Sequence, residues 1–119
     1  MARNVALIST WGTPARGREG KALEVFMELM GFWGQKAAEG KCEQPEVFFS
    51  TDASHGVFIV KGSSDVLYEI EESDEAQQLL AKGHMIVEDL KSHWYFTGDD
   101  EIQRGTQNLV QAGTALGYM

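Results

Sequence analysis

Three short segments of this chain carry apolar residues on both sides, and this feature restricts its fold more than any other. Each segment is typical of a β-strand, because a few apolar residues are bounded by turn-forming residues. Side chains of a strand alternate between two faces, so Val5 and Leu7 point away from Ala6. The segments at 46–51 and 57–61 show the same pattern. A sheet with one face in water would instead alternate apolar and polar residues. Both faces of this sheet therefore need a cover.

The order of the elements predicts the fold class. We expect strands at 4–10, 46–51, 57–61 and 87–97, a helix at 19–39, a helical region from Ser63 to Gly83, and a final helix from Asp99. The polar residues at 52–56 make the turn of a hairpin. A hairpin between two helical crossovers is the split βαβ arrangement, in which helices cover one face of an antiparallel sheet. The prediction is an α+β, ferredoxin-like βαββαβ fold with a four-stranded sheet and an extra C-terminal helix.

Helical periodicity supports the two crossovers. In the first, apolar residues recur three and four apart and so form one stripe of a helix that Gly40 ends. These residues are Leu23, Phe26, Met27, Met30, Trp33 and Ala37. In the second, Ser63 and Ser73 are both suited to cap a helix, which predicts one broken helix or two short ones. Gly83 is expected to end this region.

Two helices cover only one face of a four-stranded sheet, so the second apolar face is left over. Monomers rarely expose an apolar patch larger than roughly 300–600 Å². A second copy packed face to face would cover it, which predicts a homodimer through the sheet. The segment from Glu101 onward, folded across the same face, is the alternative.

Composition excludes several classes of partner. The 119 residues fit a single domain, with a core at about 4–97 and a helical extension at about 99–119. The net charge of −8 opposes binding to nucleic acid or to an anionic membrane surface. No apolar run is long enough to span a membrane, and a single cysteine, Cys42, gives no internal disulfide. We therefore expect a cytoplasmic protein.

The chain also resembles a known group of proteins. Residues 74–80, Asp-Glu-Ala-Gln-Gln-Leu-Leu, lead into Val87-Glu88-Asp89-Leu90, and this pattern is similar to the dimeric α+β-barrel group of ferredoxin-like proteins. The resemblance covers most of 4–97 and implies paired sheets, with a cleft between sheet and helices. The group includes antibiotic-biosynthesis-type monooxygenases, lactone isomerases and haem-degrading enzymes. The haem-degrading enzymes of this group use an Asn on the first strand together with a His and a Trp. Asn4 and His84 match in part, but strand 57–61 has no tryptophan.

Candidate site residues follow from this arrangement. We expect the cleft to be lined by Leu7, Phe26, Met30, Phe58, His93 and Trp94. His93 could act as a base near neutral pH, with Tyr95 and Asn4 as further polar groups. The primary hypothesis is a homodimeric domain that binds a small apolar molecule. A cofactor-independent monooxygenase or isomerase acting on a small apolar or aromatic substrate is the alternative, and a purely structural module using the acidic helix face is the third.

Other motifs do not favour a specific chemistry. The loop at 12–19 has the glycine spacing of a phosphate-binding loop, but Arg18 and Glu19 replace its lysine and hydroxyl residue. His84 and Glu88 have the spacing of a helical metal pair without a second pair. Cys42 lies between Glu39 and Glu43, whose charges would raise the pKa of the thiol. The sequence therefore implies neither a metal nor a cofactor.

Overall fold

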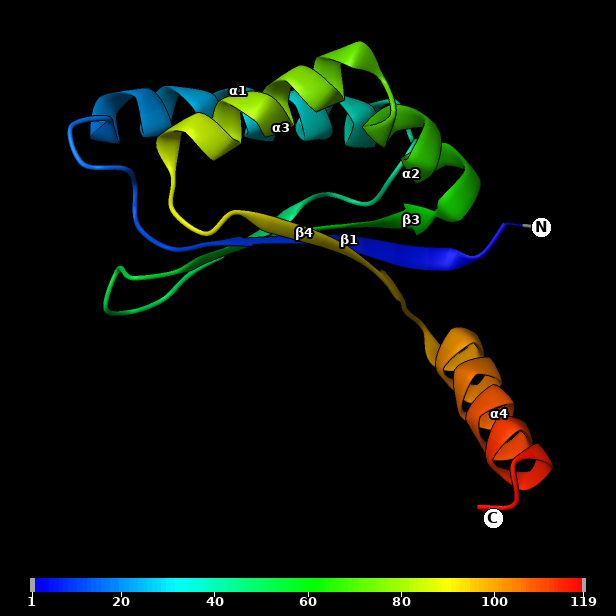
Figure 1. The fold of residues 1–119 in the computed structure, drawn as a ribbon. Helices are drawn as coiled ribbons and strands as arrows, with labels where there is room; N and C mark the ends of the chain where they lie inside the picture. Colours follow the sequence, from blue (N-terminus) through cyan, green and yellow to red (C-terminus); the bar gives the residue numbers. More distant parts are fainter. Residues whose placement is uncertain (1, 119) are drawn as a thin grey trace.

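A computed structural model describes residues 2–118 and has the predicted order of elements (Figure 1). The elements are β1 (Asn4–Trp11), α1 (Glu19–Ala38), β2 (Glu46–Phe49), β3 (Gly56–Ser63), α2 (Ser64–Glu71), α3 (Asp74–Ile86), β4 (Lys91–Phe96) and α4 (Asp99–Ala115). The strands form an antiparallel sheet in the order β2-β3-β1-β4. Helices α1, α2 and α3 lie on one face of this sheet (Figure 1). The α+β, ferredoxin-like βαββαβ fold with an additional C-terminal helix is confirmed.

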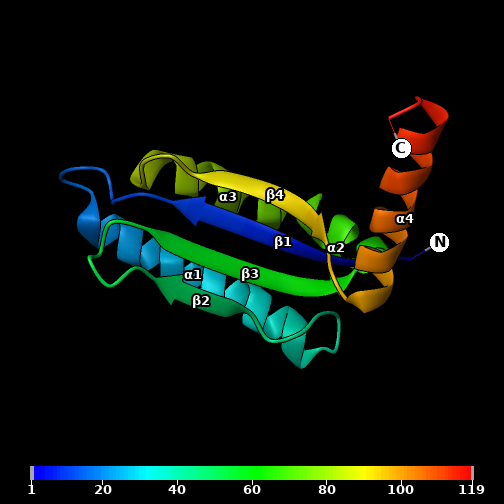
Figure 2. The same cartoon turned by 90° about the horizontal axis from the view of Figure 1, so that it is seen from below.

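The strand register assigns each residue of the sheet to a face. Leu7 on β1 pairs with Val60 on β3 and with Trp94 on β4, and these three side chains share the face toward the helices. The next residue, Ile8, pairs with Ile59 and His93 on the opposite face. We call this opposite side the open face, because no helix formed by residues 2–118 covers it (Figure 2).

The core lies between the sheet and the helices. Phe58, Val60 and Val5 from the sheet and Leu67 from α2 are almost completely buried. Trp33 and Phe32 of α1 extend this cluster, with their rings edge to face at 5.3 Å between centroids. Full burial of a side chain of this size stabilises the fold by about 1.5–3 kcal/mol. This core fixes α1 and α2 on the sheet.

The buried stripe of α1 differs from the predicted one. Trp33 is buried as predicted, but Leu23 and Met27 are 64% and 61% exposed. Ala22 and Leu29, which lie outside the predicted stripe, are buried and packed against the core, respectively. Both sets have helical spacing, because apolar residues occupy more than half of the circumference of this helix. Spacing alone therefore left the orientation of α1 open by about one residue.

Among residues 2–118, neither α1 nor any other helix is long and apolar enough to cross a membrane.

The prediction that Gly83 ends the second helical region is wrong. The region forms two helices, as one of the predictions allowed, and α3 continues through Gly83 to Ile86. A Cβ atom at Gly83 would lie 2.8 Å from Cδ2 of Leu90, so a side chain there would have to displace the end of Leu90, and glycine allows the close contact inside the helix. The following strand is shorter than the predicted 87–97, because Val87 forms only an isolated bridge with Pro14.

Helix α4 projects away from the rest of the structure and does not fold across the open face (Figures 1 and 2). Its first turn is fastened to the start of β1, where the guanidinium of Arg3 lies 2.7 Å from the buried carboxylate of Glu101. Arg3 also stacks over the ring of Phe96, 3.8 Å from its centroid. Gly98 occupies the N-cap position, and the helix begins at Asp99 as predicted.

The close packing of Trp11 on Gly56 can be tested by substitution. A Cβ atom at this buried position would lie 2.3 Å from the ring of Trp11, so Gly56→Ala must displace the indole. We expect a loss of about 1–3 kcal/mol in the free energy of unfolding in urea. The matched control is Gly31→Ala on α1, where a Cβ meets nothing within 4 Å. Gly31→Ala should raise the free energy of unfolding by about 0.5–1 kcal/mol, because alanine has a higher helix propensity than glycine. Equal effects of the two substitutions would contradict the packing described here.

Candidate functional site

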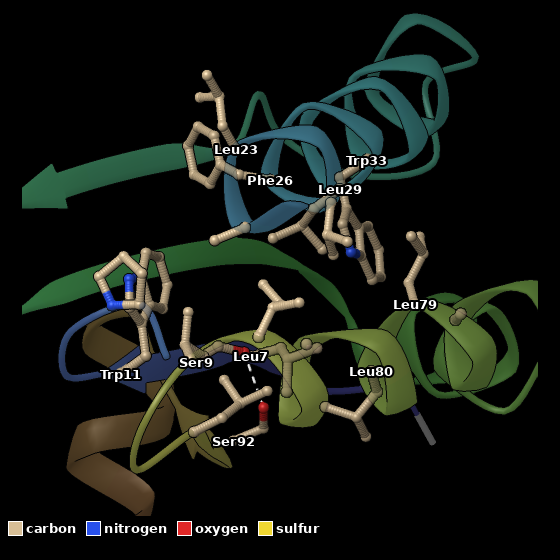
Figure 3. A pocket seen from close by; sticks show the side chains of 18 of the residues that line it. Leu7, Ser9, Trp11, Leu23, Phe26, Leu29, Trp33, Leu79, Leu80 and Ser92 are labelled. Carbon is tan, nitrogen blue, oxygen red and sulfur yellow. Dashed lines mark hydrogen bonds between the residues drawn. The ribbon is translucent and has the colours of Figure 1, made fainter. Parts of the chain in front are cut away.

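A cleft of about 350 Å³ lies between the sheet, α1 and α3 (Figure 3). Leu7, Ser9 and Trp11 of β1 form its floor, because they alternate onto the helix-facing side of the strand. One wall comes from α1 and includes Phe26, Leu29 and Trp33. The other comes from α3 and includes Leu79, Leu80 and Gly83. The lining is predominantly apolar, and the volume falls within the range of about 300–1,000 Å³ typical of small-molecule sites.

Two hydroxyl groups interrupt the apolar floor. Ser9 on β1 pairs with Ser92 on β4, and their Oγ atoms lie 2.8 Å apart (Figure 3). A hydroxyl both donates and accepts, so one bond between the two serines leaves donor or acceptor capacity unused on each oxygen. The pair can therefore hydrogen-bond a hydroxyl or carbonyl oxygen of a bound molecule.

Three aromatic rings gather at one end of the cleft. Trp11, Phe26 and Phe49 come from three different elements, and their ring centroids lie 5.6–6.5 Å apart. The interplanar angles of 50–75° are those of tilted and edge-to-face pairs. Trp11 also rests over Gly56, where a side chain would displace the indole. These rings give this end of the cleft a surface suited to a flat apolar molecule.

The loop between β1 and α1 borders the cleft at Pro14 and pairs with the end of α3 and the segment that follows it. Gly12 donates to the Glu88 carbonyl at 2.8 Å, and Ala15 donates to the Ile86 carbonyl at 2.7 Å. The guanidinium of Arg18 donates to the carbonyl of Met85. This structural role accounts for Arg18 without a bound phosphate.

The remaining polar groups of the cleft are few. The carboxylates of Glu19 and Glu71 and the amide of Gln77 line it in addition to the two serines. A carboxylate can accept a proton, and an amide can donate to or accept from an oxygen. The arrangement can hold and orient a small molecule, and Glu19 and Glu71 are its titratable groups among the described residues.

The structure brings together only part of the predicted cleft lining. Leu7 and Phe26 line the cleft as expected. Phe58 is completely buried, and Met30 and Trp94 pack against the core, so these three residues support the cleft without lining it. The ring of Trp94 packs edge to face on that of Tyr68 at 4.6 Å.

The predicted polar residues lie on the other side of the sheet. His93 and Tyr95 neighbour Trp94 in sequence and therefore point to the open face, where their rings lie 6.4 Å apart. Asn4 has the same parity on β1 and lies at its exposed start. The observed lining thus differs from the predicted one at His93, because consecutive strand residues cannot share a face. A catalytic role for His93, Tyr95 or Asn4 stays a prediction.

Sequence reasoning missed Ser9, Trp11 and Ser92 as cleft residues. Strand alternation could have identified them, because residues two apart share a face of the sheet. Ser9 and Trp11 are two and four residues after Leu7, and Ser92 is two residues before Trp94. Polar residues on an otherwise apolar strand face deserve priority as site candidates when that face meets helices. The wall residues of α3, including Leu79 and Leu80, could not be placed before the helix orientation was known.

Comparison with solved structures identifies the fold. Rv0793 from Mycobacterium tuberculosis superposes with a TM-score of 0.66 at 16% identity, covering 81% of this chain and 96% of its own. SnoaB, a cofactor-independent oxygenase from Streptomyces nogalater, has a TM-score of 0.65 at 9% identity, covering 82% and 95%. A candidate antibiotic biosynthesis monooxygenase from Deinococcus radiodurans has a TM-score of 0.63 at 13% identity, covering 80% and 93%.

The chain has the fold of the antibiotic-biosynthesis-monooxygenase-like, ferredoxin-like proteins. This agrees with the resemblance drawn from the sequence. No protein-family model matches the sequence, and no curated protein is similar to it. At these identities the structural likeness establishes the fold of the group and leaves the activity to be argued from the site.

Cys42 provides a test of the electrostatics at the edge of the core. It lies half-buried against the core, and burial raises the pKa of its thiol, with the Glu43 carboxylate raising the pKa further. We expect iodoacetamide to alkylate folded protein at pH 7.4 several-fold more slowly than a peptide of residues 38–46, because less thiolate is present. Alkylation in urea should match the peptide. A folded-state rate equal to or above that of the peptide would contradict this assignment.

Proposed function

We propose that this protein is a homodimeric, small-molecule-binding α+β-barrel domain, and that its ligand lies in the cleft between the sheet, α1 and α3. The observation that carries the proposal is the combination of an apolar cleft of about 350 Å³ with the hydroxyl pair of Ser9 and Ser92 on its floor. An apolar pocket with a few convergent polar groups is the usual form of a small-molecule site.

The lining suggests the chemical class of the ligand. Trp11, Phe26 and Phe49 offer tilted aromatic surfaces on which a flat ring can pack. Ser9 and Ser92 offer a hydrogen bond to one oxygen. The carboxylates of Glu19 and Glu71 disfavour an anionic ligand. A neutral aromatic molecule with a hydroxyl or ketone oxygen fits all three observations.

The homodimer part of the proposal is supported by the open face. Phe48 and Tyr95 are exposed there, and Ile8, Val57 and Ile59 are only half-buried within one chain. Helix α4, which the sequence offered as an alternative cover, projects away from this face (Figure 2). A second copy packed sheet to sheet would remove these side chains from water.

A cofactor-independent monooxygenase is the second candidate. The observation in its favour is the structural likeness to SnoaB, which is described as a cofactor-independent oxygenase. In this chain Glu19 and Glu71 are the groups of the cleft that could remove a proton from a bound hydroxyl. Oxygen consumption with a bound aromatic alcohol would favour this candidate over simple binding.

Ligand binding is tested with 1-naphthol as the probe. We expect 1-naphthol to quench the fluorescence of Trp11 and Trp33, which line the cleft, and to raise Tm. Leu23→Trp, at the exposed edge of the lining, should fill the cleft and abolish binding. Met27→Trp is the matched control, because it is equally exposed on the same helix but outside the lining.

The role of the serine pair is tested by comparing two ligands. Ser9→Ala should weaken 1-naphthol binding by about 2–10-fold, the effect of one hydrogen bond, and leave naphthalene binding unchanged. An oxygen electrode in the same titration separates the candidates, because turnover supports the monooxygenase. Equal binding of 1-naphthol to wild type and Leu23→Trp would reject the cleft as the site.

The sheet-to-sheet contact is tested by a charge on the open face. Ile59→Asp should lower the weight-average mass in light scattering, because an unpaired charge in the contact costs at least about 3 kcal/mol. Met27→Asp adds the same charge to an exposed apolar position on the helix side and should leave the mass unchanged. Circular dichroism checks that both variants fold. An unchanged mass for Ile59→Asp would contradict this contact.

A further inference from the structure

Helix α4 and its C-cap residue Leu116 carry a row of apolar side chains that has no partner among residues 2–118. Ile102, Leu109 and Leu116 are seven residues apart, and Thr106 and Gly113 lie between them at the alternating spacing of four and three. The opposite side of the helix holds only polar side chains and Ala115; the polar ones include Gln103, Arg104, Gln107, Asn108 and Gln111. Leu109 is 67% exposed and Leu116 is 71% exposed.

The chain itself does not supply the contacts that this helix needs. Beyond the first turn, where Arg3 holds Glu101, every residue from 102 to 115 is exposed except Gly113. Gly105, Gly113, Thr106 and Thr114 are weak helix formers, and helices of this length are marginal in water without packing. The ion pair of Arg3 and Glu101 fixes the start of α4, so the helix projects from the end of the sheet (Figure 1).

The stripe is symmetric about its central residue. Ile102 and Leu116 lie seven residues on either side of Leu109, and Gly105 and Gly113 lie four residues on either side. When two copies of α4 run antiparallel with Leu109 opposite Leu109, each Ile102 therefore faces a Leu116, and each Gly105 faces a Gly113. Such self-complementarity is what a two-fold symmetric contact requires. Glycine opposite glycine also lets the two backbones approach closely.

We propose that α4 pairs antiparallel with α4 of a second copy of this chain, centred on Leu109. This contact is separate from the cleft and from the open face. The antiparallel direction keeps the acidic first turns, with Asp99 and Asp100, at opposite ends of a pair about 25 Å long. A parallel pair would bring these like charges together. The solved relatives leave about a fifth of this chain uncovered, so the proposed contact need not be shared with them.

The proposal is tested by crosslinking the full chain in a Cys42→Ser background. Leu109→Cys should form a covalent dimer with a short bis-maleimide, because pairing raises the local concentration of the two thiols. Gln107→Cys is the matched control on the polar side of the same helix, with similar exposure. We expect at least about ten-fold more crosslinked dimer for Leu109→Cys than for Gln107→Cys at micromolar protein.

A second measurement avoids dependence on the crosslinker. Leu109→Glu should lower the weight-average mass in light scattering and reduce helical circular dichroism, whereas Gln107→Glu should change neither. Crosslinking at Leu109 with a lowered mass for Leu109→Glu supports the pairing. A lowered mass without preferential crosslinking would overturn it in favour of α4 packing elsewhere on the second copy. An unchanged mass and equal crosslinking of the two cysteine variants would overturn it outright.

Discussion

The sheet of this protein has two apolar faces, and its helices can cover only one of them. This constraint arises from β1 and β3, where apolar side chains occupy consecutive positions and strand alternation sends them to both sides. On the helix side, α1 and α3 close over Leu7, Phe58 and Val60 and leave a cleft beside the core. On the other side, Ile8 and Ile59 lie on a surface that no helix covers. One face thus carries the cleft that we propose as the ligand site, and the other carries the surface that we propose for the homodimer contact.

Much of the fold could be predicted because it depends on local patterns. Strand alternation, the cap at Ser73 and the order of the elements each depend on neighbouring residues, and all agree with the structure. Gly83 shows where this local reasoning fails. Glycine is common at helix ends, but here it lies inside α3 and allows close contact with Leu90, which belongs to the segment leading to β4 and is not a neighbour in the helix. The orientation of α1 depends in the same way on packing, which decides that Trp33 is buried and Met27 exposed.

The site could be predicted less completely than the fold. Leu7 and Phe26 were identified, because each lies on the expected inner face of its element. His93 attracted attention as a titratable group, yet its parity relative to Trp94 places it on the open face. The same parity rule, applied from Leu7, leads to Ser9 and Trp11. The face on which a strand residue lies therefore predicts its place in the cleft better than its chemical type does. Ser9 and Ser92 lie in the cleft floor, whereas His93 lies outside the cleft.

Methyl NMR can test in one sample whether the ligand contacts the cleft and whether the second copy contacts the open face. In protein with labelled Ile, Leu and Val methyl groups, the account predicts that 1-naphthol shifts the signals of Leu7, Leu29 and Leu79, which line the cleft. Dilution of the protein should instead shift those of Ile8, Val57 and Ile59 on the open face. Ligand-induced shifts concentrated at Ile8 and Ile59, with Leu7 and Leu29 unaffected, would contradict the account.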